Sequence, residues 1–232
     1  MTSERIEERL ADVRARVARA AARADRDPAG VDLLPVTKGH PASAITAVAA
    51  AGLPRIGENR VPEAAEKQAE LAGGCGLDWH MIGRLQRNKA RKAIGLFDVI
   101  ESVDSVKLAR RLSRITEEEG HEPIEVLVQV NASGEAEKAG LAPAKLAVAL
   151  DEICRLGGLR VAGLMTMAPF TADEGMLRKT FRTVREASVR CSDEVEGFEG
   201  GVLSMGMSND FEVAIEEGST RVRLGTVLLG ER

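Results

Sequence analysis

Eight short apolar runs alternate with stretches rich in Ala, Arg and Glu along most of the chain, and this alternation constrains the fold more than any other feature. The runs predict strands at residues 31–38, 53–57, 77–83, 97–103, 124–130, 161–166, 201–204 and 222–226. The stretches between them predict helices near residues 43–51, 61–72, 87–94, 105–119, 143–156, 173–195 and 209–217. Strands that alternate with helices indicate βαβ units and a parallel sheet.

Eight such units in 232 residues predict an α/β fold, a single (β/α)8 TIM barrel. The alternative is an open doubly wound sheet, which does not normally need eight near-regular units. Before the first strand, aliphatic residues at helical spacing predict an additional N-terminal helix over residues 3–26, with its apolar stripe formed by Ile6, Leu10, Val13 and Val17. Since no linker rich in Pro, Gly or Ser interrupts the chain, we expect one domain over residues 1–232.

The charge and cysteine content narrow the class of protein. The chain has 36 acidic and 32 basic residues and a net charge of −4, which argues against nucleic acid as the main partner. The N-terminus lacks the apolar segment of a secretory signal, and no apolar run is long enough to span a membrane. Cys75, Cys154 and Cys191 are odd in number and widely spaced, which suits a reducing cytoplasm. Without a CxxC or HxxxH pair, a metal site has little support.

Lys38 stands out among the polar residues that end the predicted strands, where barrel enzymes place their sites. An amine at the end of an apolar strand is partly desolvated, which lowers its pKa and favours its use as a Schiff-base nucleophile. The alternative is a lysine whose aliphatic stem lies along a strand tip while its ammonium group stays in water.

The ends of the last two predicted strands carry a second signal. Ser204 ends strand seven, and the helix after it is expected to begin at Ser208 or Asn209, where Asn209 and Glu212 resemble a capping box. Amide groups at a helix start bind phosphate, and barrels often bind phosphate after strands seven and eight. Strand eight ends in Gly225-Thr226, which offers close backbone approach and a hydroxyl group. The alternative is two ordinary turns.

Arg223 lies two residues before Gly225, so strand alternation gives both residues the same facing. An inward arginine is suited to donate to a ring nitrogen, whereas the alternative is a surface ion pair. His80 fits a ligand or base and equally a buried histidine of the barrel interior. A basic cluster either meets an anionic partner or is a solvated helix face; it comprises Arg84, Arg87, Lys89, Arg91 and Lys92.

Taken in order, several segments resemble the pyridoxal 5′-phosphate (PLP) homeostasis protein family, which is related to the barrel domain of alanine racemase. The matching segments are Val36-Thr37-Lys38, Gly57-Glu58-Asn59, and residues 79–83, 102–104, 128–131, 163–166, 203–208 and 218–226. They extend from about residue 30 to residue 230, nearly the whole predicted barrel.

The resemblance implies that PLP is the cofactor and forms a Schiff base with Lys38. It implies further that the phosphate is held by Ser204, Gly225 and Thr226, that Arg223 faces the pyridine nitrogen, and that Asn59 approaches the cofactor from strand two. It assigns no catalytic residue. The chain departs from the family pattern at two positions, neither of them in the lysine or the phosphate motif: Arg60 stands where the family usually has Tyr, and Glu101 where it often has His.

A cofactor carrier and an amino-acid racemase are the two functions that the resemblance leaves open. Racemisation needs two bases on opposite faces of the substrate carbon, and in the racemase relatives the second is a tyrosine from a separate β-domain. This chain has no tyrosine and ends where the predicted barrel ends. We therefore expect a non-catalytic carrier, a monomer that supplies PLP to apo-enzymes, with a PLP-dependent racemase as the alternative.

Overall fold

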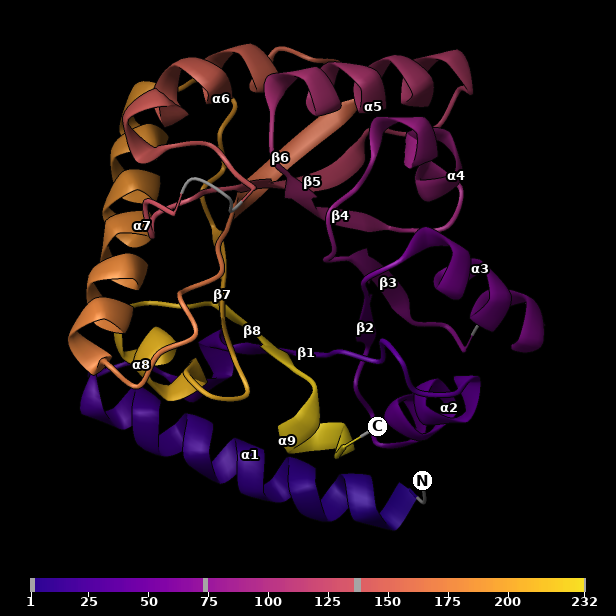
Figure 1. Ribbon diagram of the computed structural model, residues 1–232, viewed down its shortest axis with the longest axis vertical. Coiled ribbons are helices and arrows are strands. Elements are labelled where there is room, and N and C mark those ends of the chain that lie inside the picture. The colour runs from indigo at the N-terminus through magenta and orange to yellow at the C-terminus, as the bar shows by residue number, and fades with distance from the viewer. Residues whose placement is uncertain (1–2, 73–74, 136–138, 232) are drawn as a thin grey trace.

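The structure, a computed structural model, describes residues 3–72, 75–135 and 139–231. Eight parallel strands form one sheet in the order β1-β8-β7-β6-β5-β4-β3-β2, and helices surround it (Figure 1). The strands are β1 (Asp32–Pro35), β2 (Arg55–Glu58), β3 (Asp78–Met81), β4 (Val99–Val103), β5 (Ile124–Gln129), β6 (Leu159–Met165), β7 (Val202–Met207) and β8 (Arg221–Leu224). The predicted parallel barrel is therefore confirmed.

The helices of the outer layer follow the strands in turn. They are α2 (Ala42–Ala50), α3 (Val61–Glu70), α4 (Ala90–Ile94), α5 (Val106–Glu118), α6 (Leu146–Cys154), α7 (Glu174–Glu194), α8 (Phe211–Glu216) and a short α9 (Thr226–Leu229). Short 3-10 turns, η1 (Pro28–Gly30), η2 (Arg87–Lys89) and η3 (Pro143–Lys145), precede β1, α4 and α6. None of the helices in the described part of the chain combines the length and the apolar character that crossing a bilayer requires.

The barrel has one weak seam, between β1 and β2. β1 pairs with β8 over four residues. On its other side, the ladder to β2 consists, within the described residues, of a single bridge between Val36 and Gly57. The Thr37 amide adds a hydrogen bond of 3.1 Å to the Gly57 carbonyl. The seam is therefore pinned at the carboxyl ends of its two strands.

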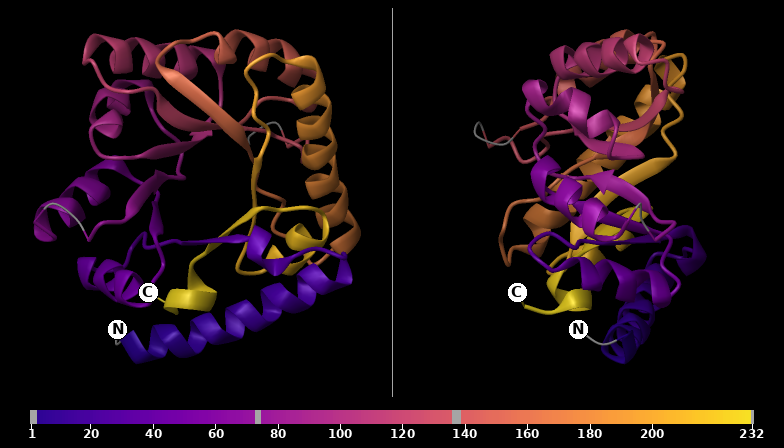
Figure 2. Two further views of the ribbon diagram at one scale, coloured as in Figure 1. Left: turned by 180° about the vertical axis from the view of Figure 1, so that it is seen from behind. Right: turned by 90° about the vertical axis from the view of Figure 1, so that its right-hand side faces the viewer.

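Helix α1 (Ser3–Arg23) confirms the predicted N-terminal helix, although it ends three residues earlier than expected. Its apolar stripe is buried and packs on α2, α8 and α9, so that α1 covers the outside of the β8–β1 region (Figures 1 and 2). At its polar edge Arg16 pairs with Glu212 of α8 at 2.6 Å, and the same guanidinium lies 4.5 Å from the centroid of the Phe211 ring.

Two local predictions were wrong. Helix α8 begins at Phe211, and the Asn209–Glu212 capping box does not form. Residues 208–210 form a turn in which Asp210 accepts a hydrogen bond from the Met207 amide at 2.5 Å, while Glu212 is drawn to Arg16 instead. Strand alternation also does not extend from Arg223 to Gly225, because β8 ends at Leu224 and the chain bends into α9.

Candidate functional site

Lys38 lies in a tight turn at the carboxyl end of β1. The turn is closed by a hydrogen bond of 3.0 Å from the His40 amide to the Thr37 carbonyl, and Gly39 has a φ of 75°, a left-handed conformation that favours glycine. Lys38 itself is half-buried between the buried Thr37 and the exposed Gly39. Lys38 is thus placed at the carboxyl-end face of the barrel, in a turn whose backbone is held by a hydrogen bond.

A largely buried ion-pair cluster of Lys67, Glu58 and Glu63 makes hydrogen bonds to the backbone of this turn. The Lys67 ammonium of α3 donates to the Thr37 carbonyl (2.8 Å), to Glu58 Oε1 (2.7 Å) and to Glu63 Oε1 (2.8 Å). The Thr37 hydroxyl also donates to Glu58 Oε1, at 2.6 Å. Glu63 accepts a further hydrogen bond of 2.5 Å from the backbone amide that follows Lys38. The cluster therefore hydrogen-bonds to the peptide groups on both sides of Lys38.

Burial sets the electrostatics of the cluster. Desolvation raises the pKa of Glu58, although the hydrogen bonds from Lys67 and Thr37 oppose the rise. Glu63 is more exposed. Desolvation raises its pKa, but the hydrogen bonds from Lys67 and Gly39 and the positive charges nearby together lower it below its ordinary value. Lys67 is the compensating charge for both carboxylates.

Arg223 lies inside the barrel at the end of β8, with 4% of its surface exposed. Its Nη1 donates to the carbonyl and the hydroxyl of Ser204 (2.7 and 2.8 Å), and its Nη2 donates to the Thr166 carbonyl (2.7 Å). Burial lowers the pKa of Arg223, and the charge of Glu101 opposes this. The guanidinium is inward and locked by β6 and β7, which excludes the surface ion pair.

Glu101 is the hub of the polar network beneath Arg223. It accepts from the Ser204 hydroxyl at 2.6 Å and from Arg221 at 3.1 Å, and it lies 2.8 Å from Nδ1 of His80. Desolvation alone would raise its pKa, but His80 and the two arginines lower the pKa of Glu101 to about 2. His80 is a hydrogen-bonded residue of the barrel interior, the second of its two interpretations.

Ser204 therefore has its hydroxyl hydrogen directed to Glu101 and its oxygen to Arg223. The predicted contact of Ser204 with a phosphate stays a prediction, and these bonds argue that Ser204 orients Arg223. The other two predicted phosphate residues, Gly225 and Thr226, lie at the start of α9.

The turn from β8 into α9 is open to a ligand. A Cβ on Gly225 would meet, among the described residues, only Val36 at 3.9 Å, so the backbone there is approachable. Ser208 lies at the same turn, because its hydroxyl accepts a hydrogen bond of 3.4 Å from the Val227 amide. The sequence prediction did not include Ser208 in the site. The sequence feature that could have indicated it is the position of Ser208 directly after the apolar run of β7.

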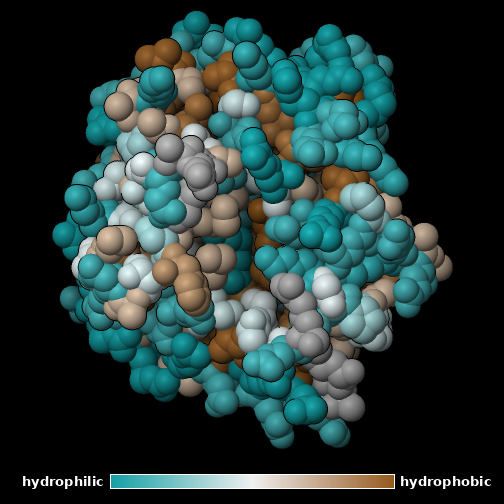
Figure 3. Space-filling model, in the orientation of Figure 1, coloured by the Kyte–Doolittle hydropathy of each residue, from teal (hydrophilic) through white to brown (hydrophobic). Residues whose placement is uncertain are grey.

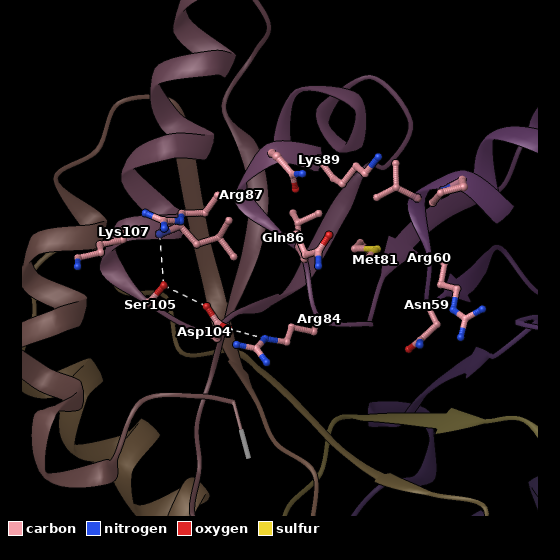
Figure 4. A pocket seen from close by; sticks show the side chains of 15 residues that line it. Asn59, Arg60, Met81, Arg84, Gln86, Arg87, Lys89, Asp104, Ser105 and Lys107 are labelled. Atoms are coloured by element: carbon pink, nitrogen blue, oxygen red, sulfur yellow. Dashed lines mark hydrogen bonds and ion pairs between the residues drawn. The ribbon is translucent and has the colours of Figure 1, made fainter. Parts of the chain in front are cut away.

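Asn59 follows β2 and is half-buried. Asn59 packs closely on Gly83. A Cβ atom on Gly83 would lie 2.6 Å from Asn59 Oδ1, so this position requires glycine. Asn59 lines a cavity of about 1210 Å³ at the carboxyl ends of β2, β3 and β4, which Figure 4 shows from close by. In space filling, the same face is hollowed at its centre and largely hydrophilic (Figure 3).

The predicted site residues converge from neighbouring strands. Lys38 and Asn59 follow β1 and β2 at the seam, while Arg223 lies near the end of β8 and Gly225 follows it, and β8 pairs with β1. An amine, an inward guanidinium and an approachable glycine turn at one end of the barrel fit an aldehyde-bearing aromatic phosphate ester such as PLP. Within the described residues no group of three or more His, Cys, Asp or Glu is arranged to hold a metal ion.

Comparison with known proteins gives the family. The model of the alanine racemase N-terminal domain matches residues 9–232. The pyridoxal phosphate homeostasis protein of Pseudomonas aeruginosa is 44% identical over 227 residues, 98% of this chain and 96% of that protein.

Among solved structures, PipY of Synechococcus elongatus with PLP bound is 40% identical, with a TM-score of 0.85 over 97% of this chain and 100% of PipY. PipY without PLP gives a TM-score of 0.87 at 41% identity. Alanine racemase of Clostridium difficile shares the fold alone, at 16% identity and a TM-score of 0.79, and this chain covers 57% of it. The barrel, the full-length matches and the identities show that the chain belongs to the pyridoxal phosphate homeostasis protein family, with the fold of the alanine racemase N-terminal domain.

Proposed function

We propose that this protein binds PLP reversibly, as a Schiff base on Lys38, and supplies it to the apo forms of PLP enzymes. The carrying observation is the convergence of Lys38, Arg223 and the Gly225-Thr226 turn at the joined ends of β1 and β8. The PLP-bound PipY structure, 40% identical over nearly all of this chain, supports the same ligand.

Each residue has a distinct part in the proposal. The Lys38 amine would hold the aldehyde carbon of PLP, and the Arg223 guanidinium would face the pyridine nitrogen. Ser208, Gly225 and Thr226 receive the phosphate at the open turn, with Ser204 acting through Arg223. Asn59 forms the wall on the β2 side. PLP supplies an electron sink when bound, and a guanidinium at the ring nitrogen keeps that nitrogen unprotonated, which weakens the sink.

The carrier function is favoured over racemisation because the second base has no evident source. The chain contains no tyrosine, and His80 is buried against Glu101. The names of the full-length relatives describe homeostasis. The proposal also takes the protein to be a monomer of one domain and to act in the cytoplasm, which its three free cysteines suit.

Lys38→Ala tests the covalent attachment. We expect the wild-type protein with PLP to show a visible absorbance band that borohydride abolishes, with the reduced adduct mapping to residue 38. The Lys38→Ala protein should lack the band, and Lys179→Ala, which removes an exposed lysine of α7, should keep it. An undiminished reducible adduct in Lys38→Ala would overturn the assignment.

A transfer assay separates carrier from racemase. Holo-protein is mixed with an apo-transaminase, and recovered transaminase activity is followed against an equal amount of free PLP. Transfer without conversion of L- to D-amino acids is the expected result. Racemisation without transfer would favour the alternative, and light scattering in the same buffer checks the monomer.

A further inference from the structure

A cationic pocket lies beside the proposed cofactor site, on the same face of the barrel. Among the described residues that line this cavity are five cationic side chains and one carboxylate, Asp104; the five are Arg60, Arg84, Arg87, Lys89 and Lys107. Figure 4 shows Arg87 and Lys107 on one side of the pocket and Asn59 with Arg60 on the other. Arg84 lies 3.8 Å from Asp104, so the carboxylate offsets one charge at most.

Of the remaining cations, Arg60 lies close enough to Glu63 of α3 to lower the pKa of that carboxyl, and the other three are not neutralised by the described residues. Within the described part of the chain, the side chains of Arg87, Lys89 and Lys107 make no hydrogen bond and no ion pair. Elsewhere arginines commonly have carboxylate partners, as Arg178 of α7 has Glu217, the residue after α8, at 3.3 Å. An unpaired positive cluster on a chain of net charge −4 focuses attraction for anions at this one place.

The positive surface is longer than a small anion needs. A second hollow of about 560 Å³ shares Arg87 and Lys107 with the pocket and continues along α5 to Arg114. Arg114 lies seven positions after Lys107 along the helix, which is roughly 10 Å. Because Arg114 and Arg110 each have a glutamate partner, the attraction is strongest at the pocket and declines along the helix. This extent suits a segment of a macromolecule.

The lining also distinguishes between classes of macromolecule. The floor contains the buried apolar side chains of Met81, Leu85 and Leu108, which suit an apolar side chain between acidic ones. No aromatic side chain lines either hollow within the described residues, so the stacking platforms typical of single-stranded RNA binding are missing. The chemistry favours an acidic protein segment over RNA.

We infer that the cationic pocket and the adjoining α5 surface dock an acidic, partly apolar segment of the protein that receives the cofactor. That the docked protein is the recipient rests on the proposed function; the binding of an acidic segment does not. A recipient held here lies beside Asn59, at the mouth of the site, so that the cofactor leaves the carrier next to its acceptor.

Fluorescence anisotropy with a short labelled peptide of alternating Glu and Leu measures the docking. We expect the charge reversal Arg87→Glu/Lys107→Glu to weaken binding about tenfold or more and to reduce its salt dependence, because each reversed cation lines the pocket. The matched control is Lys179→Glu/Arg190→Glu, which makes the same charge change at two exposed residues of α7 on the other side of the barrel. Its affinity for the peptide should stay within about twofold of wild type.

Three results would overturn the inference: equal weakening by both double variants, tighter binding of an RNA homopolymer of equal charge, or full displacement of the peptide by inorganic triphosphate at equal concentration.

Transfer of PLP to an apo-transaminase then tests whether the docked protein is the recipient. Arg87→Glu/Lys107→Glu should keep the visible PLP band yet transfer more slowly than the control, and equal rates would refute the recipient's identity. A wild-type protein without a PLP band would instead refute the proposed function, leaving the peptide result intact.

Discussion

At the level of single residues, the environment of Lys38 depends on a second lysine. Lys67 is buried, with 6% of its surface exposed, and its ammonium group has three hydrogen-bond acceptors. A buried charge pair stabilises little relative to an apolar pair, but removing one partner leaves an uncompensated charge and is costly. The cluster therefore makes the geometry of the Lys38 turn sensitive to any change at Lys67 or Glu58.

Lys67→Met should destabilise the protein by about 3–5 kcal/mol and weaken PLP binding, because Glu58 loses its counter-charge and the Thr37 carbonyl its donor. Loss of Lys67 removes an influence that lowers the Glu58 pKa, so that pKa rises further above its unfolded value. An acid with a raised folded pKa loses stability as pH increases through that pKa, so the variant should be weaker at pH 8 than at pH 5.

Urea unfolding at both pH values and PLP titration by absorbance measure these effects. Lys92→Met removes an exposed lysine and is the matched control. A Lys67→Met protein with unchanged PLP affinity would show that the cluster does not position Lys38.

At the level of secondary-structure elements, α1 takes part in building the barrel wall. Its buried stripe packs on α8 and α9, which flank the β7 and β8 ends that carry the proposed phosphate turn. The salt bridge from Arg16 to Glu212 is partly exposed and contributes little by comparison with the apolar contact.

Leu10→Ala should therefore lower the free energy of unfolding by about 2–5 kcal/mol, the usual cost of a large-to-small change at a buried site. Leu10 is 3% exposed, whereas Arg14 lies on the solvent face of the same helix. Arg14→Ala should change the free energy by less than about 0.5 kcal/mol. Chemical denaturation of both variants provides the comparison, and similar losses would show that α1 is not held by its stripe.

At the level of the whole molecule, the barrel is tied together across its interior by Glu101. This carboxylate of β4 joins β3 through His80, β7 through Ser204 and β8 through Arg221. Few contacts close the barrel at the β1–β2 seam. We therefore expect that the unfolding of one strand also unfolds the other strands. Residues 1–232 should then unfold as one cooperative unit.

Acid unfolding tests both the contribution of Glu101 to stability and the prediction of one cooperative unit. The pKa of Glu101 is about 2 in the folded protein, below its ordinary value near 4.5, so its stabilisation is present above pH 4.5 and is lost as pH falls toward 2. The shift corresponds to on the order of 3 kcal/mol. We expect one transition, coincident by far-UV circular dichroism and by the fluorescence of the single tryptophan, Trp79, and two separated transitions would disprove a single unit. Glu101→Gln should flatten the pH dependence while lowering stability at pH 7.

The barrel, the N-terminal helix and the placement of Lys38 and Gly225 at strand ends could all be predicted from the sequence alone. These features follow from local patterns: apolar runs, helical spacing and the rule that barrel sites lie at the carboxyl ends of strands. The start of α8 was mispredicted because a local capping pattern lost to an ion pair between Glu212 and Arg16, 196 residues apart.

Which polar groups are hydrogen-bonded or ion-paired to one another could be known only from the folded structure. Ser204 meets Glu101 across 103 residues, and Arg221 meets the same carboxylate across 120. No sequence periodicity relates such positions, since their contact depends on the strand order of the closed sheet. The partners of Lys67 and the unpaired cations beside Asn59 are likewise products of closure, because burial and the distance between charges exist only once the strands are in register.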